Sequence, residues 1–215
     1  DRTFFVCGLY ERRFVIKMNI VFAYPTGLNP QKGGVERITD IIAKILLKRG
    51  YTIFYLNWKR EQDNYEYPVP VIDLPSSNLE DPNNLEVYNR FLKENRIDVI
   101  INQHGLYEGT YFLSQVKVQN VKIISVLHSD PFGYYNHLFA DLMTLRDSSI
   151  KEKVKRVARF FLYRKVKKII HRSLVNHYTF IQEHPQYVCL LSESYKERLE
   201  EYCDLPDNYF ISIPN

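Results

Sequence analysis

Residues 18–50 read MNIVFAYPTGLNPQKGGVERITDIIAKILLKRG. An apolar run at residues 20–24 is ended by a proline and followed by a loop rich in Gly, Pro and Asn, which predicts a buried β-strand that enters a loop. Isoleucine and leucine then recur at helical spacing, and residues 48–50 (KRG) have the basic, glycine-terminated pattern of a helix end. This stretch therefore predicts a strand, a loop and a helix over residues 35–49.

The same alternation continues to the end of the chain. Further strands are predicted at residues 52–56, 69–74, 97–101, 122–127, 187–191 and 209–213, and further helices at about 85–95, 110–116 and 192–202. Prolines surround the strand at 69–74, which favours an edge position. Continuous apolar strands separated by helices imply crossover connections. The predicted fold class is α/β, with a Rossmann-like, mostly parallel sheet and helices on both faces.

Composition fits one domain of this kind. The chain has 215 residues, of which 45% are hydrophobic, enough for one sizeable core. Three scattered cysteines indicate a reducing compartment, and no run approaches the roughly 18 apolar residues of a membrane span, so we expect a cytoplasmic location. The apolar patch within residues 1–17 is shorter than a signal-peptide core. We therefore assign residues 1–17 to an N-terminal extension or leader and residues 18–215 to the domain.

Polar clusters follow four of the predicted strands. They are the Gly33-Gly34 loop and residues 102–109, 128–132 and 192–194. Ligands of open parallel α/β sheets collect outside the carboxyl ends of the strands. If the strands are parallel, all four clusters face one crevice.

The Gly33-Gly34 pair has two interpretations. Backbone N–H groups at the start of a helix can approach a phosphate closely where no Cβ intervenes, and the helix dipole favours the negative charge. The alternative is a flexible turn before the helix. The loop matches neither the Gly-x-Gly-x-x-Gly dinucleotide fingerprint nor the Gly-Lys-Ser/Thr of a P-loop.

Two histidines follow strand ends. His128 lies where its imidazole can donate a hydrogen bond to a sugar hydroxyl or a leaving phosphate, although a structural role is also open. Asp130 either belongs to the same site or shapes the turn at Pro131. His104 follows another strand and is a candidate acceptor contact. The remaining histidines lack ligand spacing, and we predict no metal site.

Residues 151–172 form a predicted basic amphipathic helix. They hold ten Lys and Arg residues and one Glu, a net charge of +9, in a chain of net charge +4. The apolar side chains that follow helical spacing are Val154, Val157, Ala158, Phe161, Leu162, Val166, Ile169 and Ile170.

Two compatible interpretations of this helix remain open. Its apolar stripe packs on the core while the charges are solvated, or a basic side with Lys155, Arg159, Lys167 and Lys168 contacts an anionic membrane. No zinc finger, RNP-like motif or helix-turn-helix accompanies the charge, so we expect no nucleic-acid partner.

The order of these segments resembles the amino-terminal domain of family 4 glycosyltransferases, which have the GT-B fold. The matching segments are residues 18–25, GGVER at 33–37 leading to KRGY at 48–51, VLH at 126–128, and LLSES at 190–194 ahead of IPN at 213–215. Residues 133–186 do not align with the family pattern.

The resemblance implies a two-domain protein whose C-terminal, donor-binding domain is absent from this chain. The full-length protein is expected to be a hexosyl-type glycosyltransferase that is retaining and metal-independent. Its substrates are expected to be a nucleotide-sugar donor and a glycan or lipid-linked acceptor, with no permanently bound cofactor. The isolated domain is expected to be inactive.

The resemblance also assigns residues. It implies that Gly34 and Gly33 contact the donor diphosphate and that His128 lies near the transferred sugar. It carries Glu36, Asp130 and His104 over less specifically, to acceptor binding or to the surroundings of the site.

Two other functions compete with this one. A nucleotide-dependent oxidoreductase or epimerase is compatible with a Rossmann-like sheet but lacks the fingerprint. A non-catalytic module that docks on a membrane or a partner is compatible with the basic helix.

Overall fold

The computed structural model describes residues 17–59, 64–105, 108–143, 150–184, 186–201, 206 and 209–213. Apart from Lys17, the predicted leader lies outside these residues. The elements in chain order are β1 (Asn19–Tyr24), α1 (Gly34–Lys48), β2 (Thr52–Asn57), β3 (Val71–Asp73), α2 (Pro82–Glu94), β4 (Val99–Asn102), α3 (Glu108–Leu113), β5 (Lys122–Leu127), α4 (Gly133–Met143), α5 (Ile150–Glu183), β6 (Tyr187–Leu190), α6 (Glu193–Glu200) and β7 (Phe210–Ser212).

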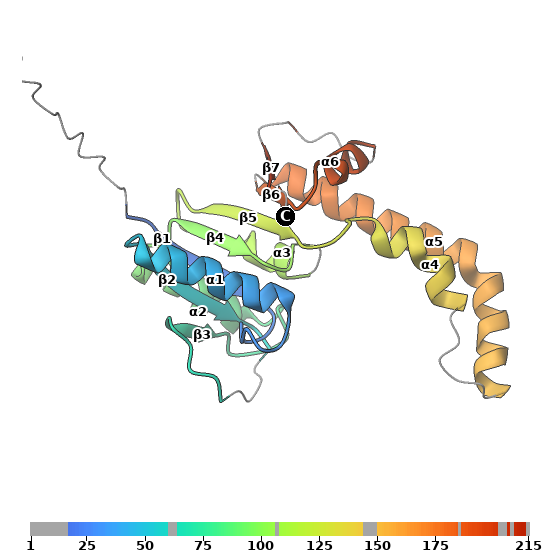
Figure 1. Cartoon of the computed structure of the whole chain (residues 1–215), viewed down its shortest axis with the longest axis horizontal. Helices are drawn as coiled ribbons and strands as arrows, with labels where there is room; N and C mark the ends of the chain where they lie inside the picture. The colour runs from blue at the N-terminus through green and yellow to red at the C-terminus, as the bar shows by residue number, and fades with distance from the viewer. Residues whose placement is uncertain are drawn as a thin grey trace, which may run out of the picture.

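The strands form one seven-stranded sheet in the order β3-β2-β1-β4-β5-β6-β7 (Figure 1). Every pair of neighbouring strands is parallel. The α/β fold class and the parallel sheet are therefore confirmed. So is the edge position of β3, where prolines predicted it.

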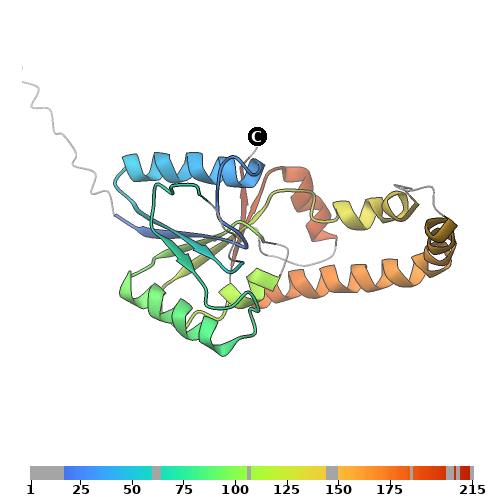
Figure 2. The same ribbon diagram turned by 90° about the horizontal axis from the view of Figure 1, so that it is seen from below.

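Alternate side chains of the strands enter two different cores. On β1, Val21 and Ala23 pack with α2 and α3, whereas Ile20 and Phe22 pack with α1. Seen from below the view of Figure 1, α1 lies on one side of the sheet and α2, α3 and α5 lie on the other (Figure 2). Leu127 at the end of β5 joins a third cluster with α5 and α6.

The face that carries α1 is covered on only one half. Crossovers between parallel strands are right-handed, so the covering face depends on the direction in which the chain moves along the sheet. The connection from β1 to β2 moves toward β3 and places α1 on one face. The connections from β3 to β7 move the other way and place their helices on the opposite face.

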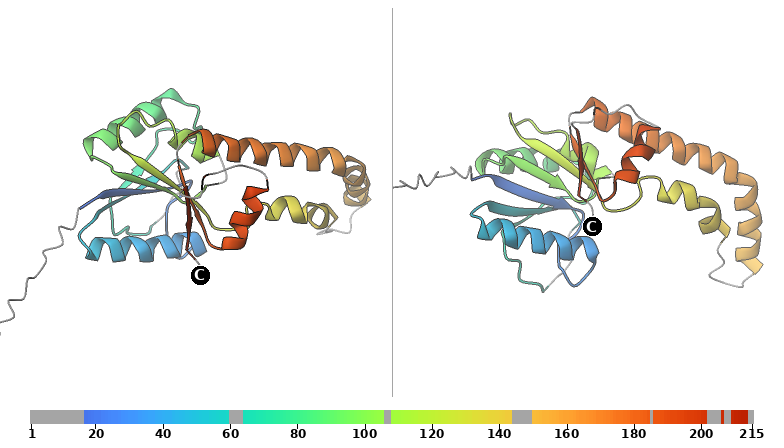
Figure 3. Two further views of the ribbon diagram at one scale, coloured as in Figure 1. Left: turned by 90° about the horizontal axis from the view of Figure 1, so that it is seen from above. Right: turned by 45° about the horizontal axis from the view of Figure 1, so that its top comes forward.

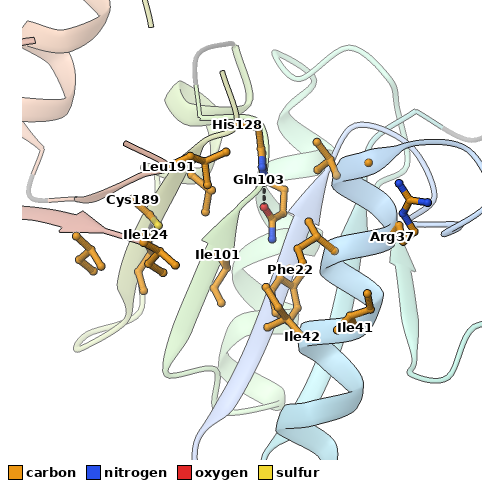
Figure 4. Close-up of a pocket in the computed structure, with 16 residues that line it drawn as sticks. Phe22, Arg37, Ile41, Ile42, Ile101, Gln103, Ile124, His128, Cys189 and Leu191 are labelled. Carbon is orange, nitrogen blue, oxygen red and sulfur yellow. Dashed lines mark hydrogen bonds between the residues drawn. The ribbon is translucent and has the colours of Figure 1, made fainter. Parts of the chain in front are cut away.

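An apolar hollow results, which we call the open trough. It has a volume of about 680 Å³, and its floor includes Ile101, Ile124, Val126, Cys189 and Ile211. Its side wall is α1, from which Ile42 extends toward Phe22 (Figure 4) and which also contributes Ile38 and Ile41 to the lining. The exposed fraction of Ile41 and of Ile45 is 46%, whereas the α1 residues that face the sheet, Thr39, Asp40 and Ala43, are buried.

Helices α4 and α5 form an arm. They pack against each other, and the N-terminal part of α5 extends well away from the sheet (Figures 1 and 3). Sequence reasoning missed α4 and found only part of α5. Of the two interpretations left open for this helix, packing of the apolar stripe on the core does not hold for the outer part of α5, because Val154, Val157 and Phe161 are exposed. The side chain of Arg159 lies outside the described residues. Within the described residues, no helix is long and apolar enough to span a membrane.

Candidate functional site

The candidate site lies at the carboxyl edge of the sheet, where the strand order reverses. The chain leaves β1 toward β2 on one side, and β4 lies on the other side of β1. Such a switch point is where open α/β sheets bind ligands. The four polar clusters predicted from the sequence follow β1, β4, β5 and β6, which are neighbours in the sheet. The four clusters therefore lie at one edge of the sheet, but residues 192–194 and Asp130 line neither the open trough nor a smaller cavity at this edge, so the sharing of one crevice by all four clusters stays a prediction.

His128 and Gln103 meet above the ends of β5 and β4. His128 Nε2 lies 2.6 Å from Gln103 Oε1 (Figure 4). Because an amide oxygen only accepts, His128 donates from Nε2, and its Nδ1 then carries the lone pair. Burial lowers the pKa of His128 below its ordinary value. The ring is therefore neutral near pH 7, with one nitrogen that can still accept a hydrogen bond.

A buried polar network holds the loop after β4. Asn102 Nδ2 donates to Thr110 Oγ1 at 3.0 Å and to Ser125 Oγ at 3.3 Å. Thr110 Oγ1 in turn donates to the carbonyl oxygen of Gly105 at 3.1 Å, and Ser125 Oγ donates to Gln186 Oε1 at 3.1 Å. The network joins β4, α3, β5 and Gln186 just before β6, and among the polar atoms described in it Gln186 Nε2 is buried without a partner. Hydrogen bonds that link several elements hold the joined backbone segments in place. The network therefore fixes the loop that presents Gln103.

Gly105 completes this loop because no larger residue fits there. A Cβ on Gly105 would lie 2.9 Å from the carbonyl oxygen of Val126 on the neighbouring strand. His177 Nε2, from α5, donates to the Gly105 carbonyl oxygen at 2.8 Å. The base of the arm is thus tied to the site.

His104 lines a smaller cavity of about 90 Å³ at the same edge, together with Tyr24, Gln103 and His128. Its ring meets the Tyr24 ring edge-on, with centroids 5.9 Å apart. Its backbone N–H donates to Asn102 Oδ1 at 3.0 Å. Burial, with smaller effects from Lys59 and His128, lowers the pKa of His104 to about 4. Two neutral imidazoles therefore share this edge near pH 7.

Gly33 and Glu36 belong to the start of α1. Gly33 is the N-cap, and Glu36 is the third residue of the helix. A Cβ on Gly33 would collide with the Glu36 carboxylate, which is buried against it. A carboxylate at this position complements the helix dipole, as in a capping box. Glu36 therefore already provides a negative charge at the N-terminus of α1.

Gly34 differs from Gly33 in its surroundings. It is exposed and lines the open trough, and no atom lies within 4 Å of a Cβ built there. Nothing in the packing of the protein requires glycine at this position. The space beside Gly34 is accessible to a ligand from the trough.

Asp130 has partners outside the site. Its Oδ1 accepts from the backbone N–H of Phe132 at 2.9 Å, and its carboxylate pairs with Arg198 of α6. Asp130 lines neither cavity. Its contacts agree with the second interpretation of this residue, in which it shapes the turn at Pro131.

Two residues of this edge were not singled out from the sequence. Gln103 lies in the loop after β4, and its only signal was a polar residue directly after a buried strand. Arg37 lines the open trough, but its guanidinium points away from the His128–Gln103 pair (Figure 4). A cation in the first turn of a helix opposes the helix dipole, and this unusual placement could have drawn attention to Arg37.

The arrangement offers hydrogen bonds from neutral groups. Among the described residues, no group of three or more His, Cys, Asp or Glu side chains is placed to hold a metal ion. The edge presents an imidazole nitrogen, an amide and the exposed start of a helix. These groups suit a ligand with hydroxyl and phosphate groups.

Comparisons with known proteins show distant similarity in fold. No family model and no curated protein matches the sequence. The crystal structure of WaaG, a glycosyltransferase involved in lipopolysaccharide biosynthesis, matches 91% of this chain with 14% identity and a TM-score of 0.47. The crystal structure of a putative epimerase from Burkholderia cenocepacia J2315 matches 81% with 11% identity and a TM-score of 0.42. The chain spans 44% and 53% of the lengths of these two proteins. Similarity at this level assigns no function to the chain.

Proposed function

We propose that this chain is the acceptor-side domain of a glycosyltransferase. The full-length protein moves a sugar from a nucleotide-sugar donor to a glycan or lipid-linked acceptor, with retention of configuration and without a metal ion. The observation that carries the proposal is the meeting of the α1 N-terminus, Gln103 and neutral His128 at the switch point of the sheet.

The start of α1 supports a role in binding the donor phosphates. Its N–H groups and dipole favour an anion, and Gly34 is open to the trough. Because the Glu36 carboxylate packs against Gly33, we assign the closer phosphate contact to the Gly34 side of the turn. Gly33 then serves to make room for Glu36.

His128 supports recognition of the transferred sugar. In the reaction, the bond from the sugar C1 to the donor phosphate oxygen breaks, and a bond from C1 to the acceptor oxygen forms. The nucleoside diphosphate leaves with the bonding electrons, and the acceptor hydroxyl proton passes to the departing phosphate oxygen. His128 accepts a hydrogen bond from a hydroxyl of the sugar at its Nδ1. The Nε2 of His128 donates to Gln103 Oε1, and this bond fixes the imidazole ring.

The first test replaces His128 in the full-length protein. His128→Ala is expected to lower sugar transfer about 100-fold or more, as loss of a positioned hydrogen-bonding group at the reacting centre does. Transfer from a panel of nucleotide-sugars to lipid and glycan acceptors is the measurement. Near-normal transfer by the variant would remove His128 from the site.

Gln103 provides a graded comparison. Gln103→Leu keeps the side-chain size but removes the oxygen that orients His128, so we expect a smaller loss of transfer than for His128→Ala.

Binding of NAD(H), followed by fluorescence, tests the competing oxidoreductase or epimerase function. Clear micromolar binding together with no sugar transfer would overturn the proposal.

A further inference from the structure

The arm carries an exposed apolar surface at its outer end. Along α5, the exposed fractions are 64% for Val154, 59% for Val157 and 78% for Phe161. These residues are spaced by three and four positions, so they lie on one face of the helix. A large aromatic side chain exposed to this extent at the end of a projecting helix is unfavourable in water.

The same face of α5 continues with positive charge toward the sheet. Lys165, Lys168 and Arg172 extend the spacing of three and four residues, and all three are exposed. From Val154 to Arg172 the path along α5 is about 27 Å, at about 1.5 Å per residue, and the helix bends between its outer part and the part nearer the sheet (Figure 1).

The other side of α5 faces α4. The ring of His171 lies 5.4 Å from that of Tyr135, and Lys167 Nζ lies 4.8 Å from the Tyr135 centroid. Contact with α4 therefore leaves the face with Phe161 and Lys165 directed outward. We call the face formed by Val154, Val157, Phe161, Lys165, Lys168 and Arg172 the arm face.

The charge of the helix restricts what can cover the arm face. Residues 151–172 have a net charge of +9, with Glu152 as the single acidic residue. A second copy of this helix would bring like charges together, which disfavours self-association. A nucleic acid would satisfy the charges but would leave Phe161 and the valines in water. An anionic lipid surface satisfies both halves of the arm face, since lipid headgroups attract the cations and acyl chains accept the apolar side chains.

We propose that the arm face docks the protein on an anionic membrane surface, with Phe161, Val157 and Val154 inserted between lipids and the basic half of the face on the headgroups. The docking is peripheral, through the surface of α5. It is independent of the proposed reaction, so the vesicle experiment and the transfer assay can fail separately.

The experiment measures binding to vesicles by co-sedimentation. The full-length protein is expected to bind vesicles of phosphatidylcholine with phosphatidylglycerol, and to bind pure phosphatidylcholine weakly. The variant Lys165→Gln/Lys168→Gln/Arg172→Gln is expected to bind about tenfold or more weakly, because each basic residue near an anionic lipid surface strengthens binding. The variant Val157→Gln/Phe161→Gln is expected to lose binding to a similar degree.

Matched controls change the same chemistry elsewhere on the chain. Lys48→Gln/Lys117→Gln/Lys122→Gln removes three exposed positive charges from the sheet domain. Ile41→Gln/Ile45→Gln removes two apolar side chains that are each 46% exposed on α1. Both controls are expected to bind vesicles like the unchanged protein. Equal losses in arm and control variants would overturn the proposal.

Insertion of the arm face into the lipid can be detected directly by tryptophan fluorescence. Phe161→Trp adds a fluorophore to the arm face, while the native Trp58 is 1% exposed in the sheet domain and serves as a constant background. A blue shift of the emission with anionic vesicles is expected. The proposal is overturned by an unshifted emission, by binding that ignores lipid charge, by self-association through the arm without lipid, or by duplex DNA that displaces the vesicles.

Discussion

At the scale of single residues, Gly33 and Gly34 look alike in sequence but differ in what surrounds them. Gly33 makes room for the Glu36 carboxylate, whereas nothing lies near a Cβ on Gly34. The family resemblance assigned both residues to the donor diphosphate, Gly34 first and Gly33 with it. It could not separate them, because the difference depends on the way in which the Glu36 side chain turns back over the start of the helix.

This difference leads to a prediction for Gly34→Ala. Alanine lowers the backbone entropy cost of the helix, so the free energy of unfolding should stay the same or rise by about 0.5 kcal/mol. Sugar transfer should nevertheless fall if the donor phosphate approaches this backbone. Urea unfolding and the transfer assay measure the two effects.

Gly33→Ala is the matched comparison and should behave in the opposite way. Its Cβ would displace the end of the Glu36 side chain, so the carboxylate must leave its place at the start of α1, and the free energy of unfolding should fall by about 1 kcal/mol or less. If Gly34→Ala transfers sugar normally, the donor does not approach Gly34.

The pKa of His104 makes stability depend on pH. The unfolded chain takes up a proton on His104 below about pH 6.5, whereas the folded protein does so only near its lowered pKa of about 4. Stability should therefore be highest above pH 6.5 and fall as the pH drops from 6.5 toward 4. The ring is partly exposed, so solvent screening reduces the effect to on the order of 1 kcal/mol.

Urea unfolding at about pH 7.5 and about pH 5 measures this dependence. His104→Gln cannot titrate, so the variant should lose less stability between the two pH values than the unchanged protein. The carboxylates contribute equally to both proteins and cancel in the comparison. Equal losses would show that His104 titrates normally in the folded protein.

At the scale of elements, strands were easier to predict than helices. Strands β1 and β5 are apolar runs between breakers, and such runs are buried in any parallel sheet. Helix α3 was predicted over residues 110–116 but begins at Glu108, with Gly109 inside it. A Cβ on Gly109 would lie 2.8 Å from the Trp58 ring. That contact joins distant parts of the chain, so local spacing could not predict the helix start.

For helix α5, the sequence predicted the helix but not the surroundings of its apolar face. Its apolar residues recur at helical spacing, which predicted a helix correctly but could not tell what covers its face. The surroundings of Phe161 depend on the direction in which the arm leaves the sheet, and that direction is set by contacts near Tyr178 and Ile181, well outside the predicted segment. The sequence therefore predicted the helix and its charge and left two interpretations of its apolar face open, of which packing on the core fails for the outer half.

The loop after β4 depends on the network around Thr110, and a matched pair of variants tests it. Thr110→Val keeps the shape but leaves Asn102 Nδ2 and the Gly105 carbonyl without this hydroxyl. It should lower the free energy of unfolding by about 2 to 3 kcal/mol. Thr110→Ser keeps the hydroxyl and loses one buried methyl, at a cost of about 1 kcal/mol. Similar losses in urea unfolding would mean that the network is not formed in solution.

At the scale of the whole molecule, the two faces of the sheet are unequal. Helices α2, α3, α5 and α6 cover one face, and α1 covers only part of the other. The sequence predicted helices on both faces from the need of a parallel sheet to bury both. The order of the strands decides how many helices fall on each face, and strand order is not readable from apolar periodicity.

Two neighbouring isoleucines on β5 allow the packing of the two faces of the sheet to be compared by experiment. Ile123 is 7% exposed in the core with α2 and α3, whereas Ile124 points to the opposite face and lines the open trough. Ile123→Ala should lower the free energy of unfolding by about 2 to 4 kcal/mol, because it leaves a cavity in a packed core. Ile124→Ala should cost about 1 kcal/mol or less, since its side chain already meets the open trough. Urea unfolding of the two variants gives the difference directly, and the shared strand and side chain remove any effect of β-propensity. Equal costs would mean that Ile124 is as tightly packed in solution as Ile123, and that the trough is closed.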